Sequence, residues 1–200
     1  DWFMAPHNHD YYAYSNPEGY PHVRQLVRDM VDSLEVSGFD WSGYDNDGDG
    51  HVDALNLIHQ GHGAEQGDYS NIWSHKWSLG DLAVNYDGVT INSYNISPEK
   101  QSGSIVAIGV LAHEFGHALG LPDLYDTDYS STGAGKLALM ASGSWGTSSN
   151  SPWYPSTMVG WCKNELGWVN IIDLQESQSD VGIVQTYSSS DIYRVNHPEA

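Results

Sequence analysis

The sequence predicts an α+β fold, because helical and strand-like patterns both occur along the chain. Apolar residues recur at helical spacing in residues 23–34, and a second, strongly apolar helical run covers residues 104–119. Between these two helices lie short β-like runs at 54–59, 71–77 and 82–96. Two helices and several strands therefore form the framework in which the candidate functional residues lie.

The boundaries of the first elements are marked by spacing and turn residues. The apolar positions of residues 23–34 fall at i, i+3, i+4, i+7, i+8 and i+11, which is one face of an amphipathic helix, and Gly38 ends it. Residues 54–59 are short and apolar, so we expect a buried strand there. Asp87 and Gly88 are a hairpin pair, so the strands on either side of them are expected to be antiparallel.

The second half of the chain is predicted to be less regular. Residues 104–119 are apolar almost all round, which predicts a central helix, and Gly120 stands where a left-handed C-cap belongs. A long Ser/Gly-rich stretch, 126–156, follows it, and residues 161–166 are expected to form a short helix. After about residue 170 the pattern becomes β-like.

The charge balance restricts the possible partners. The 200 residues include 7 Lys and Arg against 26 Asp and Glu, so the formal net charge is -19. Nucleic acids, anionic membranes and nucleotides need Lys/Arg patches, and we therefore exclude them as partners. The 8 Trp and 13 Tyr residues argue against a disordered acidic chain. The balance favours cations as partners.

Targeting signals and the single cysteine say little about the function of the chain. No run approaches the roughly 18 apolar residues of a membrane span, so no span is expected. The start, Asp1 to Met4, lacks the features of a signal peptide, as expected of a mature secreted protein or of a fragment. Cys162 is the single cysteine, so it forms no internal disulfide. We interpret it as a buried apolar residue, with a reactive thiol or a partner in another chain as alternatives.

The strongest functional signal is His113-Glu114-x-x-His117 inside the second helix. Histidines at i and i+4 lie on one helix face, so both imidazoles can reach one ion. Glu114 can contact a water on that ion and take its proton. Two protein ligands, an open position and a carboxylate base are the parts of a catalytic zinc site.

The third ligand is less sharply defined by the sequence. The run from His113 through Gly120 to Asp123 resembles the extended metzincin signature, in which the glycine allows a sharp turn and a third ligand returns to the metal. Most metzincins carry His where this chain has Asp123, and a carboxylate is also a legitimate zinc ligand. The alternative third ligands are His62, Glu65, His75 and Glu165.

Several segments together resemble one family, the immune inhibitor A family (M6) of secreted bacterial zinc metallopeptidases. The similarity runs from about residue 21 to 170 and rests on segments 61–65, 72–77, 113–126 and 140–145. It implies a zincin/metzincin-like catalytic domain with a mixed sheet, an active-site helix and an irregular lower lobe. Met140 in Met-Ala-Ser-Gly-Ser-Trp145 resembles the Met-turn beneath the metal, with ordinary core packing as the alternative.

The resemblance also implies roles and boundaries. It makes His113, His117 and Asp123 zinc ligands and Glu114 the general base. It places a catalytic domain at 1–170, in which we expect the N-terminal strand of relatives to be missing, and the start of a β-rich segment at 171–200. Astacin-like metzincins carry Tyr two residues after the Met, where this chain has Ser142, so the motif assigns no tyrosine to the transition state.

The acidic loop, defined as residues 45–53, has the spacing of an EF-hand calcium loop. Carboxylates stand at positions 1, 3, 5 and 9, Gly50 at position 6 allows the sharp turn, and a backbone carbonyl is available at 7. Position 12 is Asn56 where an EF-hand has Glu, so we expect an isolated structural Ca²⁺ site, with a solvated turn as the alternative. The expected calcium ligands are Asp45, Asp47, Asp49, His51 and Asp53.

The sequence thus predicts a secreted zinc endopeptidase that hydrolyses peptide bonds in proteins or peptides through a zinc-activated water. The alternatives are a calcium-dependent binding or adhesion module with a vestigial zinc site, and a zinc hydrolase that acts on a non-peptide bond. The wall of the substrate pocket is expected in the region that follows the zinc motif. The aromatic candidates for it are Tyr125, Tyr129, Trp145, Trp153 and Tyr154.

Overall fold

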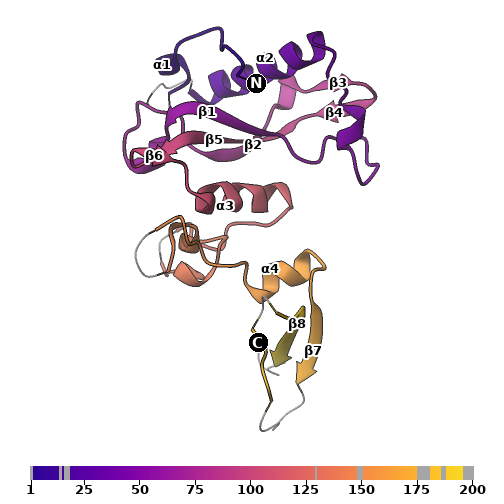
Figure 1. Ribbon diagram of the computed structural model, residues 1–200, viewed down its shortest axis with the longest axis vertical. Coiled ribbons are helices and arrows are strands. Elements are labelled where there is room, and N and C mark those ends of the chain that lie inside the picture. Colours follow the sequence, from indigo (N-terminus) through magenta and orange to yellow (C-terminus); the bar gives the residue numbers. More distant parts are fainter. Residues whose placement is uncertain are drawn as a thin grey trace.

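The computed structural model describes residues 2–13, 15, 19–128, 130–147, 151–174, 181–185 and 188–195. Figure 1 shows an N-terminal part in which helices lie above a sheet, with helix α3 beneath that sheet. A less regular part follows α3 and leads to a small C-terminal group that contains the last helix and the last strands. The predicted combination of helices and mixed strands is confirmed.

The helices are α1 (His9–Tyr12), α2 (Gly19–Val36), α3 (Ile108–Ala118) and α4 (Gly160–Glu165). The strands are β1 (Asn56–His62), β2 (His75–Ser78), β3 (Val84–Tyr86), β4 (Val89–Ile91), β5 (Ser93–Gln101), β6 (Ser104–Ile105), β7 (Asn170–Leu174) and β8 (Asp191–Val195). Short 3-10 turns lie at Ser42–Tyr44, Ala64–Gln66, Gly80–Leu82, Gly135–Leu137 and Ser142–Trp145. In the described part of the chain, no helix is both long and apolar enough to span a membrane.

The main sheet is mixed, with the strand order β1-β5-β2 and β6 paired to β5. β1 runs parallel to β5, and β2 runs antiparallel to it. Helix α2 supplies the upper half of the core, where Val27 and Val31 are fully buried together with Ile91 and Ile96 from the strands. The first predicted helix is therefore confirmed, and its apolar stripe faces the sheet as the spacing indicates.

The predicted hairpin is also confirmed. β3 and β4 are antiparallel, and both turn residues have positive φ, 51° at Asp87 and 87° at Gly88. A two-residue turn with both φ angles positive matches the right-handed twist of the strands that it joins. The Asp87 carboxylate also accepts a hydrogen bond of 2.9 Å from the backbone N–H of Trp41, which ties the hairpin to the loop after α2.

The expected boundaries and the expected full burial of the first strand were both wrong. The strand predicted at 54–59 covers Asn56–His62, and only one of its faces is buried, since Ile58 is 39% exposed while His59 is 7% exposed. β1 is the edge strand of the sheet, and α3 packs mainly against β5 and β2, so one face of β1 lacks a covering layer.

The second helix begins four residues later than predicted. Residues 104–105 form β6, which pairs with β5 across a tight turn at Ser102 and Gly103, where φ is 50° and 80°. This turn takes the first residues of the apolar run into the sheet. The helix is also less enclosed than expected, because Ile108 and Phe115 are both more than 40% exposed. α3 lies between two layers and is open along its sides.

The end of α3 follows the prediction closely. Gly120 has φ 90°, its N–H bonds to the carbonyl of His117, and the N–H of Leu121 bonds to the carbonyl of Gly116, each at 3.0 Å. These two bonds form a Schellman motif, which needs a residue with positive φ just beyond the helix. The chain therefore reverses sharply after α3 and returns beside it.

The C-terminal elements agree with the sequence as well. α4 forms where a short helix was predicted, and β7 and β8 pair in parallel. Cys162 on α4 is fully buried against Leu121 and Met140, so its interpretation as a small apolar core residue is confirmed.

The buried His59 generates a prediction about pH. Burial, followed by repulsion from His9 and His75, lowers its pKa to about 4, although its Nδ1 lies 3.0 Å from the carbonyl oxygen of Gln60. Because the folded-state pKa lies below the unfolded value of about 6.5, the folded protein binds fewer protons. The free energy of unfolding should therefore fall as pH drops from about 6.5 towards 4, by an amount on the order of 3 kcal/mol.

Urea unfolding midpoints of the parent and of His59→Met at pH 7 and pH 5 measure this effect. The parent should lose more stability than His59→Met, and His51→Gln, which changes an exposed histidine, should behave like the parent. An equal loss in parent and His59→Met would contradict the assignment.

Candidate metal sites

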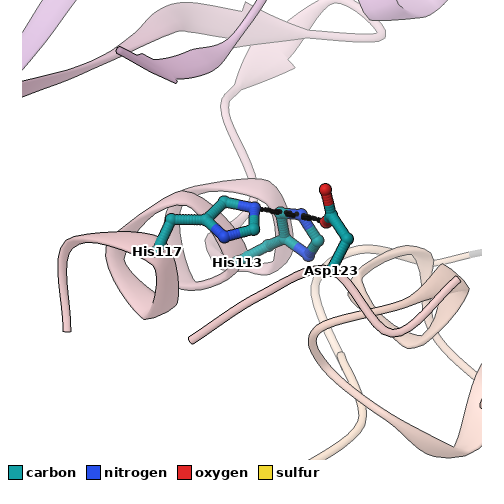
Figure 2. Close-up of side chains that lie close together, drawn as sticks. All are labelled: His113, His117 and Asp123. Atoms are coloured by element: carbon teal, nitrogen blue, oxygen red, sulfur yellow. Dashed lines mark hydrogen bonds and ion pairs between the residues drawn. The ribbon is translucent and has the colours of Figure 1, made fainter. Parts of the chain in front are cut away.

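Three polar side chains from α3 and the turn after it converge on one point (Figure 2). The Nε2 atoms of His113 and His117 lie 3.2 Å apart, and each lies 3.1–3.2 Å from Oδ1 of Asp123. The two histidines stand one helical turn apart on the same face, as their i, i+4 spacing requires. The Schellman turn then returns Asp123 to that face.

The backbone fixes the orientation of both imidazoles. Nδ1 of His113 lies 3.0 Å from the carbonyl oxygen of Leu139, and Nδ1 of His117 lies 2.8 Å from that of Leu121. A carbonyl oxygen only accepts, so each Nδ1 carries the hydrogen, and each Nε2 directs a lone pair at the common point. Such second contacts are typical of histidines that bind metals.

The donor set fits a zinc ion. The three atoms form a nearly equilateral triangle, and its edges are close to the roughly 3.3 Å that separates ligands of a tetrahedral ion with bonds of about 2.0–2.1 Å. Oδ1 of Asp123 is buried and has no further hydrogen-bond donor among the described residues. Three converging lone pairs repel one another unless a cation lies between them.

The pKa shifts of His117 and Asp123 are consistent with a site that favours positive charge. The contact with Asp123 raises the pKa of His117, because a proton on the imidazole relieves the same repulsion. Burial alone would raise the pKa of Asp123, but its contacts with the side chains of His113, His117 and Tyr125 hold it well below its usual range. Asp123 is therefore ionised, and protons compete with a metal ion for the histidines.

Glu114 lies beside the two histidines on the same helix and is only 9% exposed. Burial raises the pKa of its carboxyl, Asp123 and Glu65 add to this rise, and the two neighbouring histidines oppose it. A buried carboxylate with a raised pKa is a stronger base than an exposed one. Glu114 is thus suited to accept a proton from a molecule held at the three converging atoms.

The segment under α3 is held by contacts to two helical glycines. Met140 is fully buried, and a Cβ placed on Gly116 would lie 2.3 Å from its sulfur atom. A Cβ on Gly109 would lie 1.9 Å from the carbonyl oxygen of Ser144. Both distances are shorter than any real contact, so the helix rests on this segment through bare backbone. Gly116 lies between the two histidines, and Met140 therefore supports the helix directly below them.

None of the four alternative third ligands joins the cluster. His75 contacts the carbonyl oxygen of Trp73 at 2.6 Å and the Tyr94 hydroxyl at 3.1 Å, and Glu65 accepts a bond of 3.0 Å from the Ser74 hydroxyl. His62 lies at the end of β1 and Glu165 on α4. In the residues that the structure describes, the group around His113 contains only His117 and Asp123 besides it.

Sequence reasoning missed the groups that orient these side chains. The carbonyls of Leu121 and Leu139 leave no trace in residue type, because every residue has one. The sequence suggests Tyr125 only as a residue of the pocket wall, yet its ring stacks on that of His113, with centroids 6.5 Å apart and planes at 14°, and its hydroxyl bonds to Asp123. Of the other aromatic candidates, Trp153 and Tyr154 are exposed, Trp145 is half-buried, and Tyr129 lies outside the described residues.

The acidic loop folds around its first carboxylate. Oδ1 of Asp45 accepts from the N–H groups of Gly48 at 2.9 Å and Asp49 at 3.0 Å, and Oδ2 accepts from Gly50 at 3.0 Å. Both glycines have positive φ, which lets the loop close tightly. The carboxylates of Asp45, Asp47 and Asp49 come together within 4.8 Å of one another.

The other two expected calcium ligands, Asp53 and His51, do not direct their side chains into this carboxylate group. Asp53 turns to the start of the loop, where Oδ2 accepts from the backbone N–H of Asn46 at 3.0 Å and from its side-chain amide at 2.5 Å. It is therefore not part of the carboxylate group. The His51 side chain is exposed, while the backbone N–H of His51 donates to Oδ1 of Asp49 at 2.8 Å.

Comparison with known proteins points in one direction. The family described as "Immune inhibitor A peptidase M6, catalytic domain" matches residues 1–169. Immune inhibitor A of Bacillus thuringiensis subsp. alesti is 32% identical over 215 residues, which cover 88% of this chain and 30% of the relative. Pre-pro-metalloprotease PrtV of Vibrio cholerae serotype O1 is 30% identical over 237 residues, 98% of this chain and 25% of the relative. The chain thus spans less than a third of either relative.

The contact between Gly116 and Met140 generates a second prediction. Gly116→Ala should lower the free energy of unfolding by about 1–3 kcal/mol, because the fully buried Met140 side chain would have to shift to make room for the added methyl group. Denaturant unfolding of the metal-free protein measures the change. Gly116→Ala combined with Met140→Ala should cost less than the sum of the two single changes.

Gly43→Ala is the matched control, since its Cβ would meet no atom within 4 Å. Strict additivity of the two changes at 116 and 140 would show that they do not share the contact.

Proposed function

The chain belongs to the immune inhibitor A (M6) family of metallopeptidases, and from this we propose that it is a zinc-dependent endopeptidase that cleaves proteins outside the cell. The observation that carries the proposal is the convergence of His113, His117 and Asp123 beside the buried Glu114. Two neutral imidazoles and one carboxylate are a known donor set of catalytic zinc sites. The extracellular location rests on the family resemblance.

The proposed chemistry divides between the ion and the chain. When bound, zinc supplies Lewis acidity, which lowers the pKa of a water molecule and polarises a peptide carbonyl. The Glu114 carboxylate accepts a proton from the attacking water and later donates it to the leaving amine nitrogen. The carbonyls of Leu139 and Leu121 accept from Nδ1 of His113 and His117, which leaves the Nε2 lone pair of each ring to hold the ion. Asp123 contributes the negative charge of the ligand set.

The proposal extends to the architecture. The catalytic domain covers 1–170 and a β-rich segment begins at 171–200, and the support is that the family match ends at residue 169 and β7 begins at Asn170. Met140 serves as the Met-turn residue of a metzincin-type domain. The support for that role is its full burial against Gly116, the residue between the two histidines.

The test of the activity uses Glu114→Gln. Loss of the proton acceptor should reduce cleavage of labelled casein by about 10²–10⁴-fold while zinc content stays at the parental level. Glu165→Gln, which changes an exposed glutamate, serves as the control and should cleave at the parental rate.

Two results would count against the proposal. A Glu114→Gln protein that cleaves casein at the parental rate would rule out the assigned base. A parent protein that holds zinc but cleaves nothing, with or without phenanthroline, would favour the adhesion module with a vestigial site.

We also propose that the acidic loop binds one calcium ion that stabilises the upper part of the fold. The support is the gathering of the Asp45, Asp47 and Asp49 carboxylates within 4.8 Å in a loop with EF-hand spacing. Three carboxylates at such distances repel one another, and Ca²⁺ prefers oxygen ligands. The carbonyl of His51 is the expected backbone ligand. Asp53, which accepts two hydrogen bonds from Asn46, would close the loop and would not bind the ion.

Calcium in about 100-fold excess over its Kd should stabilise the protein by about 2.7 kcal/mol, because it binds the folded state. Melting curves in calcium and in a calcium-selective chelator measure this. The shift should vanish in Asp47→Asn, whereas Asp68→Asn, in a turn outside the loop, should keep it. Identical parental curves in both conditions would refute the calcium site.

A further inference from the structure

We propose that Tyr125 is a positioning residue for the metal, whose hydroxyl holds Asp123 in the orientation that presents one oxygen to the ion. This inference rests on the zinc site proposed above and goes beyond it, because the zinc motif and the Met segment assign no role to a tyrosine. The chemical basis is a hydrogen bond from a neutral phenol to a carboxylate that carries the charge of the site.

Tyr125 touches two of the three converging side chains. Its ring stacks on the His113 ring, with centroids 6.5 Å apart and planes at 14°. Its hydroxyl bonds to the Asp123 carboxylate. Oδ1 of Asp123 faces the histidines and has no other donor among the described residues, so the hydroxyl is left to act on the second oxygen.

Asp123 needs such support more than the histidines do. His113 and His117 lie on a helix, and each has its second ring nitrogen fixed by a backbone carbonyl. Asp123 lies on a turn, where its side chain can rotate between one-oxygen and two-oxygen contact with an ion. A donor on the outer oxygen favours the one-oxygen arrangement and retains the negative charge.

The backbone holds the segment that carries Tyr125 from both sides. The N–H of Leu124 donates to the carbonyl of Met140 at 2.6 Å, and the carbonyl of Leu124 accepts from Ala134 at 2.8 Å. Gly133, with φ 54°, packs so closely that a Cβ there would lie 2.9 Å from Cα of Tyr125. The backbone of Tyr125 is therefore held in place beside the proposed metal ligands.

Core packing does not explain this placement. Tyr125 is 45% exposed, so its ring gains only part of the apolar burial that a core tyrosine has. A tyrosine that served only as a ring over His113 could be replaced by Phe without loss. The hydroxyl is thus the part of the side chain that distinguishes positioning from packing.

Zinc affinity of the refolded metal-free protein tests the proposal through competition with a coloured chelator. Tyr125→Phe keeps the ring and removes the hydroxyl, and it should weaken zinc binding about 10–100-fold. The melting temperature of its metal-free form should equal that of the parent. Tyr154→Phe, at an 80% exposed tyrosine, is the matched control and should bind zinc like the parent.

A cobalt-substituted protein gives a second readout. If Tyr125 orients Asp123, the visible absorption bands of Co²⁺ should shift in Tyr125→Phe and stay unchanged in Tyr154→Phe. A purely structural role of the ring would leave the bands of Tyr125→Phe in place.

The outcomes separate this proposal from the proposed function. A parent that binds zinc tightly together with a Tyr125→Phe protein that binds it equally well would overturn the positioning role and leave the peptidase untouched. Equal zinc affinity with a lower kcat would also overturn it, because Tyr125 would then act on the substrate. Loss of affinity in Tyr125→Leu but not in Tyr125→Phe would assign the effect to the ring and overturn the role of the hydroxyl. A parent that binds no zinc would instead contradict the proposed function.

Discussion

Repulsion among three lone pairs, those of His113, His117 and Asp123, is the constraint on which the rest of the structure depends. Left uncompensated at separations of 3.1–3.2 Å, these groups would move apart, so the fold must hold them in place. α3 provides this rigidity because the sheet covers it from above and bare glycine backbone contacts the Met140 segment from below. A cation bound between these three groups would remove their repulsion and stabilise the folded chain, so metal affinity would be coupled to folding.

The groups that orient the site belong to the backbone more than to side chains. The segment beneath α3 supplies the carbonyl of Leu139, and the Schellman turn supplies that of Leu121. Each contact fixes a tautomer as well as a ring plane. The same turn also returns Asp123 to the helix, so a single reversal of the chain positions one ligand and orients another.

Much of this arrangement could be predicted from the sequence, since periodicity and turn chemistry act locally. The face of α2, the hairpin at Asp87 and the helix end at Gly120 each depend on a few neighbouring residues. Predictions failed where distant or competing partners decide. β6 forms because β5 offers it a partner, and Asp53 leaves the carboxylate group because Asn46 offers it two donors. The carbonyls that hold the histidines could not be predicted at all, because a carbonyl is common to every residue.

The two carboxylate groups differ in the cation that they can select. Asp123 stands half-buried with two imidazole nitrogens, a set suited to a borderline ion such as zinc, whereas the acidic loop offers only oxygens, which suit a hard ion. The loop also lies close to α3, because Asp47 and Asp49 line the same groove as Phe115 and Leu119 at the C-terminal end of that helix. A cation in the loop would thus order one wall of that groove while a cation at the histidines orders the opposite face of the helix. Only Asp45, Asp47, Asp49 and Asp123, of the 26 acidic residues, belong to these two groups, and the net charge of -19 is otherwise distributed over the rest of the chain.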